Sequence, residues 1–563
     1  MSTSGYRPRC WTPSWPAGRR RTPWSWKGWR SPGSSVASAR VHRGAALLLL
    51  YLGLTACTVV GPDYQAPPAP ALPSAWEPAR AQEQARSVGA WWQRFNDPVL
   101  DELIARSARQ NLSIEAAGLR IVQARAALGI SDALVFPQQQ QINANYSGLY
   151  RDEDWFKSAS ASLDVGWEMD IWGKYARGIE SAEATLYASI ASYHDVLVSI
   201  TAEVARNYIN YRTAEERMFL ARQNIAIQER VVEMTRVQYE SGNVSELDVQ
   251  QARTQLYATQ ASLPGLNNAR QQSLNAIAVL LGTVPETIAP LLEATGERPL
   301  PRLQTADGVA QRSGLQDVNY QQGSVIPAAP VLEPRIDSAL VLQRPDLQVA
   351  ELLARAQSAQ IGLNEANLYP QFVLFGSVGA SQTVRSSRSF DFDDAVTASI
   401  GPGLSWDIFN YDRIKNRVRI EDAAFQESLA NYNQSVLEAV REVSNALEGY
   451  QNNLERSGFD HKAVEASIRA FNISANQYNN GLVTYQRLLS TVEKMTARED
   501  IYAQTRGAIA NQLVALYKAL GGGWDTLQTG PVVKPDTVRQ MRERTDWGDY
   551  LDPETIVGED RNE

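Results

Sequence analysis

Alternating apolar and polar residues predict two pairs of β-strands, one pair in each half of the chain. From 159 to 171 the odd positions are apolar or small and the even positions are polar, and residues 396–408 repeat this alternation. A period of two gives a strand one apolar and one polar face. Shorter strands are predicted at 139–150 and 371–384. The long strands exceed the roughly 9–11 residues that a tilted strand needs to cross a membrane, which favours membrane strands over the edge of a soluble sandwich.

Apolar residues spaced by seven predict two very long helices. A seven-residue period sustained this far is typical of under-wound helices that pack knobs into holes. A helix over 174–238 would be about 100 Å long at roughly 1.5 Å per residue. Gly242 and Gly481 end the pattern, and a second helix in each half is expected to run back as far as Gly282 or Gly521, which makes two helical hairpins. The seven-spaced residues are Leu197, Val204, Tyr211, Met218, Ile225, Val232 and Tyr239, then Val436, Val443, Tyr450, Val464, Phe471 and Tyr478.

The two halves repeat one pattern, so the chain is an internal duplication rather than several domains in series. Each half has the order helix, two strands, long helical hairpin, and we assign the repeats to 99–282 and 336–523. The first helix of each half is expected at about 99–132 and 336–366. Residues that recur at an offset of 239 are Glu203, Val204, Tyr211, Tyr239, Gly242, Val244, Leu281 and Gly282, matched by Glu442, Val443, Tyr450, Tyr478, Gly481, Val483, Leu520 and Gly521.

Three segments lie outside the repeats. Residues 57–98 begin with a Pro- and Ala-rich stretch and are predicted to be an extended leader. Residues 283–335 contain seven Pro and are predicted to connect the repeats. The tail at 524–563 is polar and acidic, and we expect it to be poorly ordered.

The first 56 residues have the features of a secretory signal. A twelve-residue apolar run from Ala45 to Ala56 follows basic residues and is too short to span a bilayer as a helix. It ends in Leu-Thr-Ala-Cys, which resembles the bacterial lipobox, so Cys57 is the predicted lipid anchor; a signal peptide with a chance Cys is the alternative. Thr58, not Asp, follows the Cys, which favours the outer membrane. Residues 1–40 have no periodicity, and translation could instead begin near Val41.

Composition excludes several classes of function. The chain has 2 Cys and 3 His among 563 residues, too few for a disulfide framework or a Cys-rich zinc module. Its net charge is -8, and without the nine basic residues of 1–56 it has 45 basic and 62 acidic residues, a net charge of -17. Such a chain is a poor nucleic-acid binder and favours cations if the excess lines a pore. No catalytic or cofactor motif is present, so no enzyme activity, cofactor or metal is expected. Asp391, Asp393 and Asp394 could hold a cation, but a solvated turn is the favoured interpretation.

Four strands cannot close a barrel, and an open sheet edge in a bilayer leaves backbone groups unpaired. Closure therefore requires several chains. Three protomers would supply twelve strands, which lies within the range of outer-membrane barrels.

The chain resembles the outer-membrane efflux proteins of the TolC and OprM type and, among these, the NodT lipoprotein branch. The resemblance covers about 58–523 and rests on the start LTACTVVGPDY, the strand ends WEMDIWGK and SWDIFN, and the turns YESGNVSELDV and YNNGLVTYQRLL. It implies an α+β membrane protein, a homotrimeric TolC-like tube with a twelve-stranded outer-membrane barrel and a twelve-helix periplasmic barrel. It also implies that a periplasmic adaptor and an inner-membrane RND transporter are its partners in small-molecule efflux. A type I secretion duct and a non-conducting coiled-coil tether are the alternatives.

The resemblance also implies a gate at the hairpin turns. A carboxylate after the first turn and a Tyr before the second, bonded to each other in the family, match Asp248 and Tyr478. The chain departs from some relatives at Val483, Arg487 and Ser490, and Arg487 could instead pair with Asp248. Solvation and helix packing are the alternative roles of these side chains. Adaptor contact is expected at the turns themselves, at Tyr239, Gly242, Val244, Gly481 and Val483, with the glycines serving turn geometry.

Overall fold

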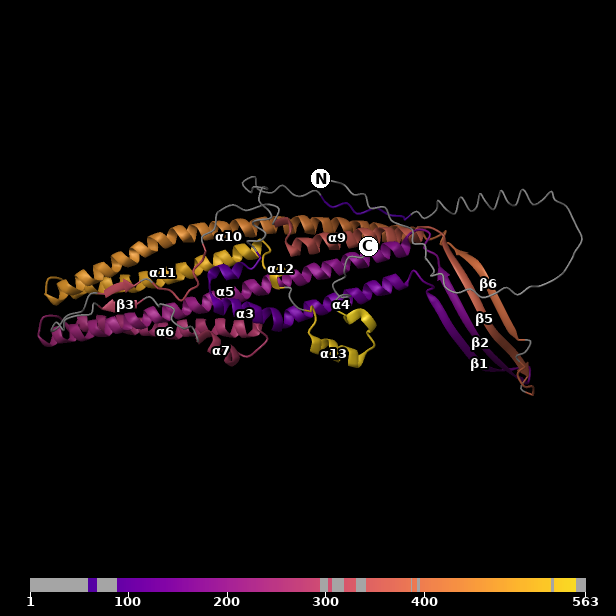
Figure 1. Ribbon diagram of the computed structural model, residues 1–563, viewed down its shortest axis with the longest axis horizontal. Coiled ribbons are helices and arrows are strands. Elements are labelled where there is room, and N and C mark those ends of the chain that lie inside the picture. Colours follow the sequence, from indigo (N-terminus) through magenta and orange to yellow (C-terminus); the bar gives the residue numbers. More distant parts are fainter. Residues whose placement is uncertain are drawn as a thin grey trace, which may run out of the picture. The chain divides into compact units, whose positions relative to one another are not determined.

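The computed structural model describes residues 59–67, 89–293, 302–305, 318–321, 323–330, 341–385, 387–391, 395–527 and 531–552. The predicted signal segment and Cys57 lie outside these residues. Figure 1 shows long helices that run side by side and a four-stranded sheet at one end of them.

The duplication appears in the helices residue for residue. Helices α5 (Lys174–Glu240) and α10 (Arg413–Asn479) both have 67 residues, and α6 (Glu246–Leu280) and α11 (Tyr485–Ala519) both have 35. Each long helix packs against the shorter one that follows it, and α5 also packs against α11. The two predicted helical hairpins are therefore confirmed, and the α5–α11 contact joins them.

Glycine ends all four of these helices in the same way. Gly242 and Gly481 have φ near +75° and +72°, in the left-handed region. The amide of Gly242 donates to Tyr239 O at 2.9 Å and the amide of Asn243 donates to Gln238 O at 2.9 Å, which is a Schellman motif. The amides of Gly282, Gly481 and Gly521, and of the residue after each, donate equivalent hydrogen bonds. The sequence signal at these glycines was therefore correct.

The sheet has the order β1-β2-β5-β6, all antiparallel. Its strands are β1 (Gln139–Arg151), β2 (Asp154–Glu168), β5 (Gln371–Arg385) and β6 (Val396–Ser405). One hairpin comes from each repeat, and β2 pairs with β5 where the repeats meet. Strands β1 and β6 each have one neighbour, so the protomer has two open sheet edges.

The seven-residue spacing describes α10 better than α5. In α10 every predicted position from Val436 to Tyr478 is buried. In α5 the predicted positions are buried as far as Met218, but Ile225 is only half-buried and Tyr239 is 43% exposed. Toward the hairpin turn the buried face of α5 moves to neighbouring positions such as Asn224 and Val231. A helix with 3.6 residues per turn drifts by about 20° per heptad unless it supercoils, which accounts for this rotation.

The predicted first helix at 99–132 is two helices, α3 (Pro98–Gln110) and α4 (Leu112–Ala133). Asn111 separates them, because its Oδ1 accepts the amides of Ser113 at 2.7 Å and Ile114 at 3.0 Å and so caps α4. In the second half α9 (Pro345–Glu365) begins after a break at Arg344, at a proline suited to a first turn. The described residues 341–342 before this break are helical, and residues 336–340 lie outside the described residues. The sequence interpretation missed the break between α3 and α4 because the capping residue Asn111 lies inside a continuous apolar pattern.

The connector and the tail contain more structure than expected. In the connector, α7 (Pro285–Glu293) packs against α6, and β3 (Arg302–Thr305) pairs with β4 (Val318–Gln321). The tail forms α12 (Trp524–Leu527), α13 (Pro535–Arg544) and the 3₁₀ helix η3 (Gly548–Leu551). Val533, Met541 and Leu551 are buried in a cluster with Ile121 of α4, so a poorly ordered tail is wrong for the described residues 524–527 and 531–552. A few apolar residues in a polar segment were enough to dock it.

Among the described helices, no single one is long and apolar enough to cross a membrane. Helices α6 and α7 meet the length and composition criterion only as a pair, and they are bent by 115° at their junction.

Candidate functional site: the membrane sheet and the hairpin tips

One face of the sheet is apolar across all four strands. Leu163 of β2 lies opposite Ile142 of β1 and Val378 of β5, and Ile400 of β6 continues the face. All four side chains are exposed in the protomer, with Ile142 and Ile400 each 81% exposed. Soluble proteins rarely expose a continuous apolar face of this kind, whereas lipid would cover it.

The opposite face of the sheet is polar and is organised around one carboxylate. Asp164 Oδ2 accepts hydrogen bonds from Asn143 Nδ2 and Ser162 Oγ, both at 2.8 Å, and Oδ1 accepts one from Ser377 Oγ at 2.6 Å. These residues belong to β1, β2 and β5, so Asp164 ties three strands together. A polar face suits water, and the two faces together match the lipid-facing and lumen-facing sides of a membrane strand.

Aromatic residues lie where the strands meet the helices. Trp172 Nε1 donates to Pro370 O at 2.8 Å and its ring stacks on Tyr369 with centroids 4.7 Å apart. Trp406 Nε1 donates to Leu368 O at 3.0 Å, and Trp167 Nε1 donates to Val135 O at 2.9 Å. Amphipathic rings at such a border are typical of the membrane–water interface.

The described part of the leader is fixed to this junction. The Val60 amide donates to Trp172 O at 3.0 Å, and the buried Arg177 donates to Val60 O at 3.2 Å and Gly61 O at 3.1 Å. Gly61 has φ +89°, and a Cβ there would lie 2.9 Å from the Gly362 nitrogen and closer still to Gly362 Cα. Only glycine suits this position, which gives the VVGPDY segment a structural role that the sequence interpretation did not assign.

The tips of the two hairpins carry the residues predicted for gating and adaptor contact. Gly242 and Gly481 are exposed, and a Cβ on either would meet no atom within 4 Å. Their constraint is therefore the positive φ alone. Val244 and Val483 are half-buried beside the tip cluster, which includes Val231, Phe471 and Leu488.

Asp248 caps the helix that follows the first turn. Its Oδ2 accepts the Ser245 amide at 3.0 Å and the Ser245 hydroxyl at 2.9 Å, in a capping box at the start of α6. The equivalent residue in the second repeat is Arg487, which is exposed, and Thr484 before it makes no side-chain cap. Among the described ion pairs none joins Arg487 to Asp248. The duplication has thus placed a carboxylate and a guanidinium at equivalent sites.

Tyr478 lies in the tip core and is 3% exposed, whereas its repeat equivalent Tyr239 is exposed. Its hydroxyl lies beside Thr235 and forms no hydrogen bond of good geometry within the described residues. Burial raises the pKa of Tyr478; contact with the Thr235 hydroxyl opposes the rise and the negative charge of Asp248 adds to it. The ring packs edge-on against Tyr485 at 5.9 Å. Asp248 is therefore close enough to act on Tyr478, but its hydrogen bonds go to Ser245, and the gate assignment stays a prediction.

Buried carboxyl groups in the helical hairpins were missed, among them Glu216 and Glu499. Glu216 is fully buried and accepts hydrogen bonds from Ser324 Oγ at 2.6 Å, from the Val325 amide at 3.0 Å and from Arg506. Glu499 is 1% exposed and accepts one hydrogen bond from Asn224 at 2.6 Å. In the sequence both resemble ordinary helix-surface glutamates, because burial on the inner face depends on which helices pack together.

Of the acidic turn predicted as a possible cation site, Asp391 is described and its amide donates to Gln382 Oε1 at 2.6 Å. Asp393 and Asp394 lie outside the described residues. Within the described part of the chain no cluster of three metal-ligating side chains occurs.

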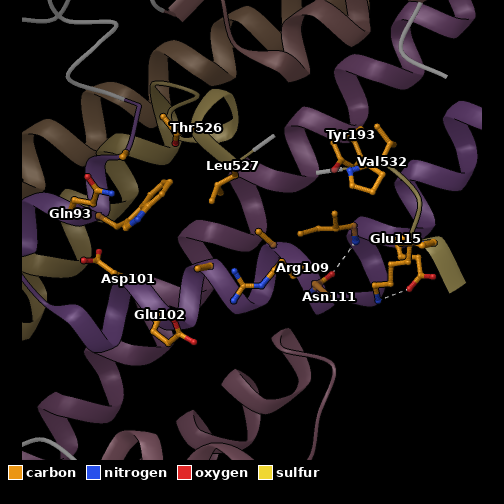
Figure 2. A pocket seen from close by; sticks show the side chains of 18 of the residues that line it. Gln93, Asp101, Glu102, Arg109, Asn111, Glu115, Tyr193, Thr526, Leu527 and Val532 are labelled. Atoms are coloured by element: carbon orange, nitrogen blue, oxygen red, sulfur yellow. Dashed lines mark hydrogen bonds and ion pairs between the residues drawn. The ribbon is translucent and has the colours of Figure 1, made fainter. Parts of the chain in front are cut away.

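A separate cavity of about 710 Å³ lies beside α3, where the C-terminal segment folds back on the helices (Figure 2). Its lining includes Asp101 and Arg109 of α3 and Val532 of the C-terminal segment. Lys534 and Glu115 also line it and form an ion pair at 2.7 Å. None of the predicted gate residues lines this cavity.

Comparison with known proteins agrees with this geometry. The chain matches the family described as outer membrane efflux protein over residues 103–283 and 336–522, and it belongs to that family. It is 28% identical to the pyoverdine export outer membrane protein OpmQ of Pseudomonas putida, over 86% of this chain and 98% of OpmQ. It is 27% identical to nodulation protein T of Rhizobium leguminosarum bv. viciae (85% and 93%) and 26% identical to the probable outer membrane lipoprotein SilC of Salmonella typhimurium (84% and 96%). Among solved structures it superposes on the outer-membrane channel OprN with a TM-score of 0.70 at 29% identity, covering 83% of this chain and 99% of OprN.

The predicted family and NodT-type branch are thus confirmed, as is the TolC-like fold of the protomer. The chain is an outer-membrane efflux channel protein.

Proposed function

We propose that three copies of this chain form a closed tube that exports small molecules from the periplasm, together with a periplasmic adaptor and an inner-membrane RND transporter. The observation that carries the proposal is the sheet. It has one apolar face, one polar face and two open edges, and it continues into helices of 67 residues. In a bilayer the open edges must pair, and pairing β6 of one copy with β1 of the next closes the sheet.

Three copies give twelve strands and twelve hairpin helices, as the resemblance implies. Each copy supplies two long hairpin helices, α5 and α10, and two short ones, α6 and α11. About 1.5 Å per residue makes α5 and α10 each roughly 100 Å long, so the tips lie far from the membrane. At that distance the turns at Gly242 and Gly481 are suited to meet an adaptor, together with Tyr239, Val244 and Val483. The relative OpmQ is by its name a pyoverdine exporter, which favours a small cargo over type I secretion of a protein.

Lipid attachment at Cys57 belongs to the same proposal. The described leader begins two residues later and is held at the aromatic border of the sheet by Trp172 and Arg177. An acylated residue just before this point would enter the outer membrane where the strands do. Labelling with a palmitate analogue should mark the wild-type protein and leave Cys57→Ser unlabelled. Equal labelling of both would refute the anchor.

The proposal is tested by reconstitution. The purified protein should migrate as a heat-modifiable trimer and form a steady conductance in planar bilayers, since the tube supplies a continuous aqueous path. Charged substitution on the apolar face, Ile400→Asp, should abolish insertion, whereas Ser399→Asp on the polar face of the same strand should not. A monomer without conductance, or equal tolerance of both substitutions, would refute a membrane channel.

The gate is proposed at the same tips. Replacing Asp248 and Tyr478 together by Ala and Phe should raise the single-channel conductance. Ser245→Ala is the matched control, because it removes part of the α6 cap and leaves Asp248, Tyr478 and Arg487 in place. If the control raises the conductance as much as the double variant, fraying of the α6 cap accounts for the effect and the gate proposal fails.

A further inference from the structure

The seam between α5 and α11 contains a carboxyl group that lacks the partners an ion needs. Glu499 Oε2 accepts a hydrogen bond from Asn224 Nδ2 at 2.6 Å, while Oε1 is buried with no hydrogen-bond partner among the described residues. A buried carboxylate is stable only when donors or cations surround it. With a single neutral donor, Glu499 favours the protonated form. Burial raises the pKa of Glu499 to about 8, and the hydrogen bond from Asn224 opposes part of that rise.

The surrounding charges do not compensate Glu499. On α5, Arg217 is paired with Asp500 at 2.6 Å. On α11, Arg506 is paired with Glu216, and Glu493 is exposed. On α10, Asp460 accepts a hydrogen bond from Thr505 Oγ1 at 2.7 Å and forms an ion pair with Arg456 at 3.3 Å, and His461 Nε2 lies 3.4 Å from Glu465 Oε1. The side chains that α6 contributes beside this seam are uncharged, among them Gln255, Thr259 and Ser262.

The position of Glu499 gives its charge a mechanical consequence. An equatorial apolar cluster ends near Tyr211 and Ile509, and the tip cluster begins near Ile227 and Met495. Glu499 lies between these clusters on α11. Glu499 and its hydrogen-bond donor Asn224 form a polar layer between the two clusters. Since α5 belongs to the first hairpin and α11 to the second, this polar layer interrupts the packing that joins the two hairpins.

Solvent has a route to the layer. A cavity of about 610 Å³ lies between α5, α6 and α11, lined by Asn224 and Thr496 among others. Thr496 Oγ1 donates to Asn224 Oδ1 at 3.2 Å, so the residue that binds Glu499 also faces the cavity. Water entering there can exchange a proton with Glu499 and hydrate the carboxylate once the helices separate.

We propose that Glu499 is a proton-operated latch on the α5–α11 seam, which holds the two hairpins together when neutral and weakens their contact when ionised. The inference rests on the proposed channel, in which separating the hairpins widens the tips at Gly242 and Gly481. Ionisation leaves the Glu499 carboxylate in the seam with a single hydrogen-bond donor. Separation of α5 from α11, which admits water from the cavity, is the smallest change that hydrates this charge. Proton release therefore favours opening.

The first arm of the test measures the proton itself and needs no channel activity. Infrared difference spectra of the purified full-length protein between pH 6 and pH 9 should contain the carbonyl band of a buried carboxylic acid that disappears on titration. Glu499→Gln should lack this band. Glu493→Gln, an exposed glutamate on the same helix beside the same cavity, should retain it. A band that is absent from wild type, or present in Glu499→Gln, overturns the proposal.

The second arm measures opening in planar bilayers. If the carboxylate is fully hydrated in the open state, linkage allows the opening equilibrium to rise by at most about 100-fold between pH 6 and pH 9, and we expect at least about fivefold. Glu499→Gln should be insensitive to pH and Glu493→Gln should behave as wild type. Equal pH dependence in wild type and Glu499→Gln overturns the latch. If wild type shows no conductance at all, the proposed channel function fails instead, and the infrared arm still decides the protonation of Glu499.

Discussion

Substituting Gly61 tests whether the leader is a structural strap. In Gly61→Ala the new Cβ would collide with the Gly362 backbone, and the φ of +89° disfavours any side chain. The left-handed backbone alone costs about 1–2 kcal/mol. If the leader shifts to relieve the collision, the buried Arg177 loses its hydrogen bonds to Val60 O and Gly61 O, at about 1.5 kcal/mol or more each for a charged donor. The ion pair with Asp63 adds little, because the Asp63 side chain is 93% exposed. We expect a total of about 4–5 kcal/mol.

Two matched variants separate the contributions to this loss. Gly242→Ala also changes a glycine with positive φ, but its Cβ meets open space, so only the backbone cost of about 1–2 kcal/mol is expected. Gly362→Ala has an ordinary φ, but its Cβ would lie 2.7 Å from Val60 O and 2.9 Å from Arg177 Nε, so it should reproduce the leader effect without the backbone cost. The assays are the unfolding midpoint by circular dichroism and the rate of proteolysis within the leader. If Gly61→Ala and Gly362→Ala are as stable and protected as Gly242→Ala, the leader is not a strap.

Three further predictions concern two buried carboxyl groups and the carboxylate on the polar face of the sheet. Because the pKa of Glu499 is raised in the folded state, the folded chain keeps a proton that the unfolded chain releases. The free energy of unfolding of wild type should therefore fall as pH rises from about 4.5 to about 8, by about 1.4 kcal/mol per pH unit relative to Glu499→Gln. Parallel stability–pH curves for the two proteins would contradict this. Glu216→Ala leaves Arg506 without its buried partner and should cost about 3–5 kcal/mol, whereas Glu233→Ala, which breaks an exposed pair with Arg236, should cost less than about 1 kcal/mol in the same denaturation assay. Asp164→Asn should weaken the expected cation preference measured by reversal potential, while Asp154→Asn at the exposed end of β2 serves as control; an anion-selective wild type would refute an acidic lumen.

The sequence by itself determined the repeating elements. Period-two alternation located β2 and β6, and the less regular strands predicted at 139–150 and 371–384 match β1 and β5; the observed bounds differ from the predicted ones by up to five residues. The glycines at 242, 282, 481 and 521 located the helix ends, since each backbone adopts a positive φ that other residues avoid. The offset of 239 residues implied equal halves, and the helices of 67 and 35 residues follow it. These features are local or periodic, so the identity and spacing of residues specify them.

Only the tertiary structure decided which side of each long helix is buried and what lies there. The duplication makes Tyr239 and Tyr478 equivalent in sequence, yet one is exposed and the other buried, because α5 rotates away from its seven-residue spacing near the tip and α10 does not. The same packing buries Glu499 and Glu216, which the sequence cannot distinguish from solvated glutamates. It also brings Gly61 against Gly362, some 300 residues later in the chain. Long-range contacts depend on how elements with similar faces are paired, and that choice belongs to the whole fold rather than to any one segment.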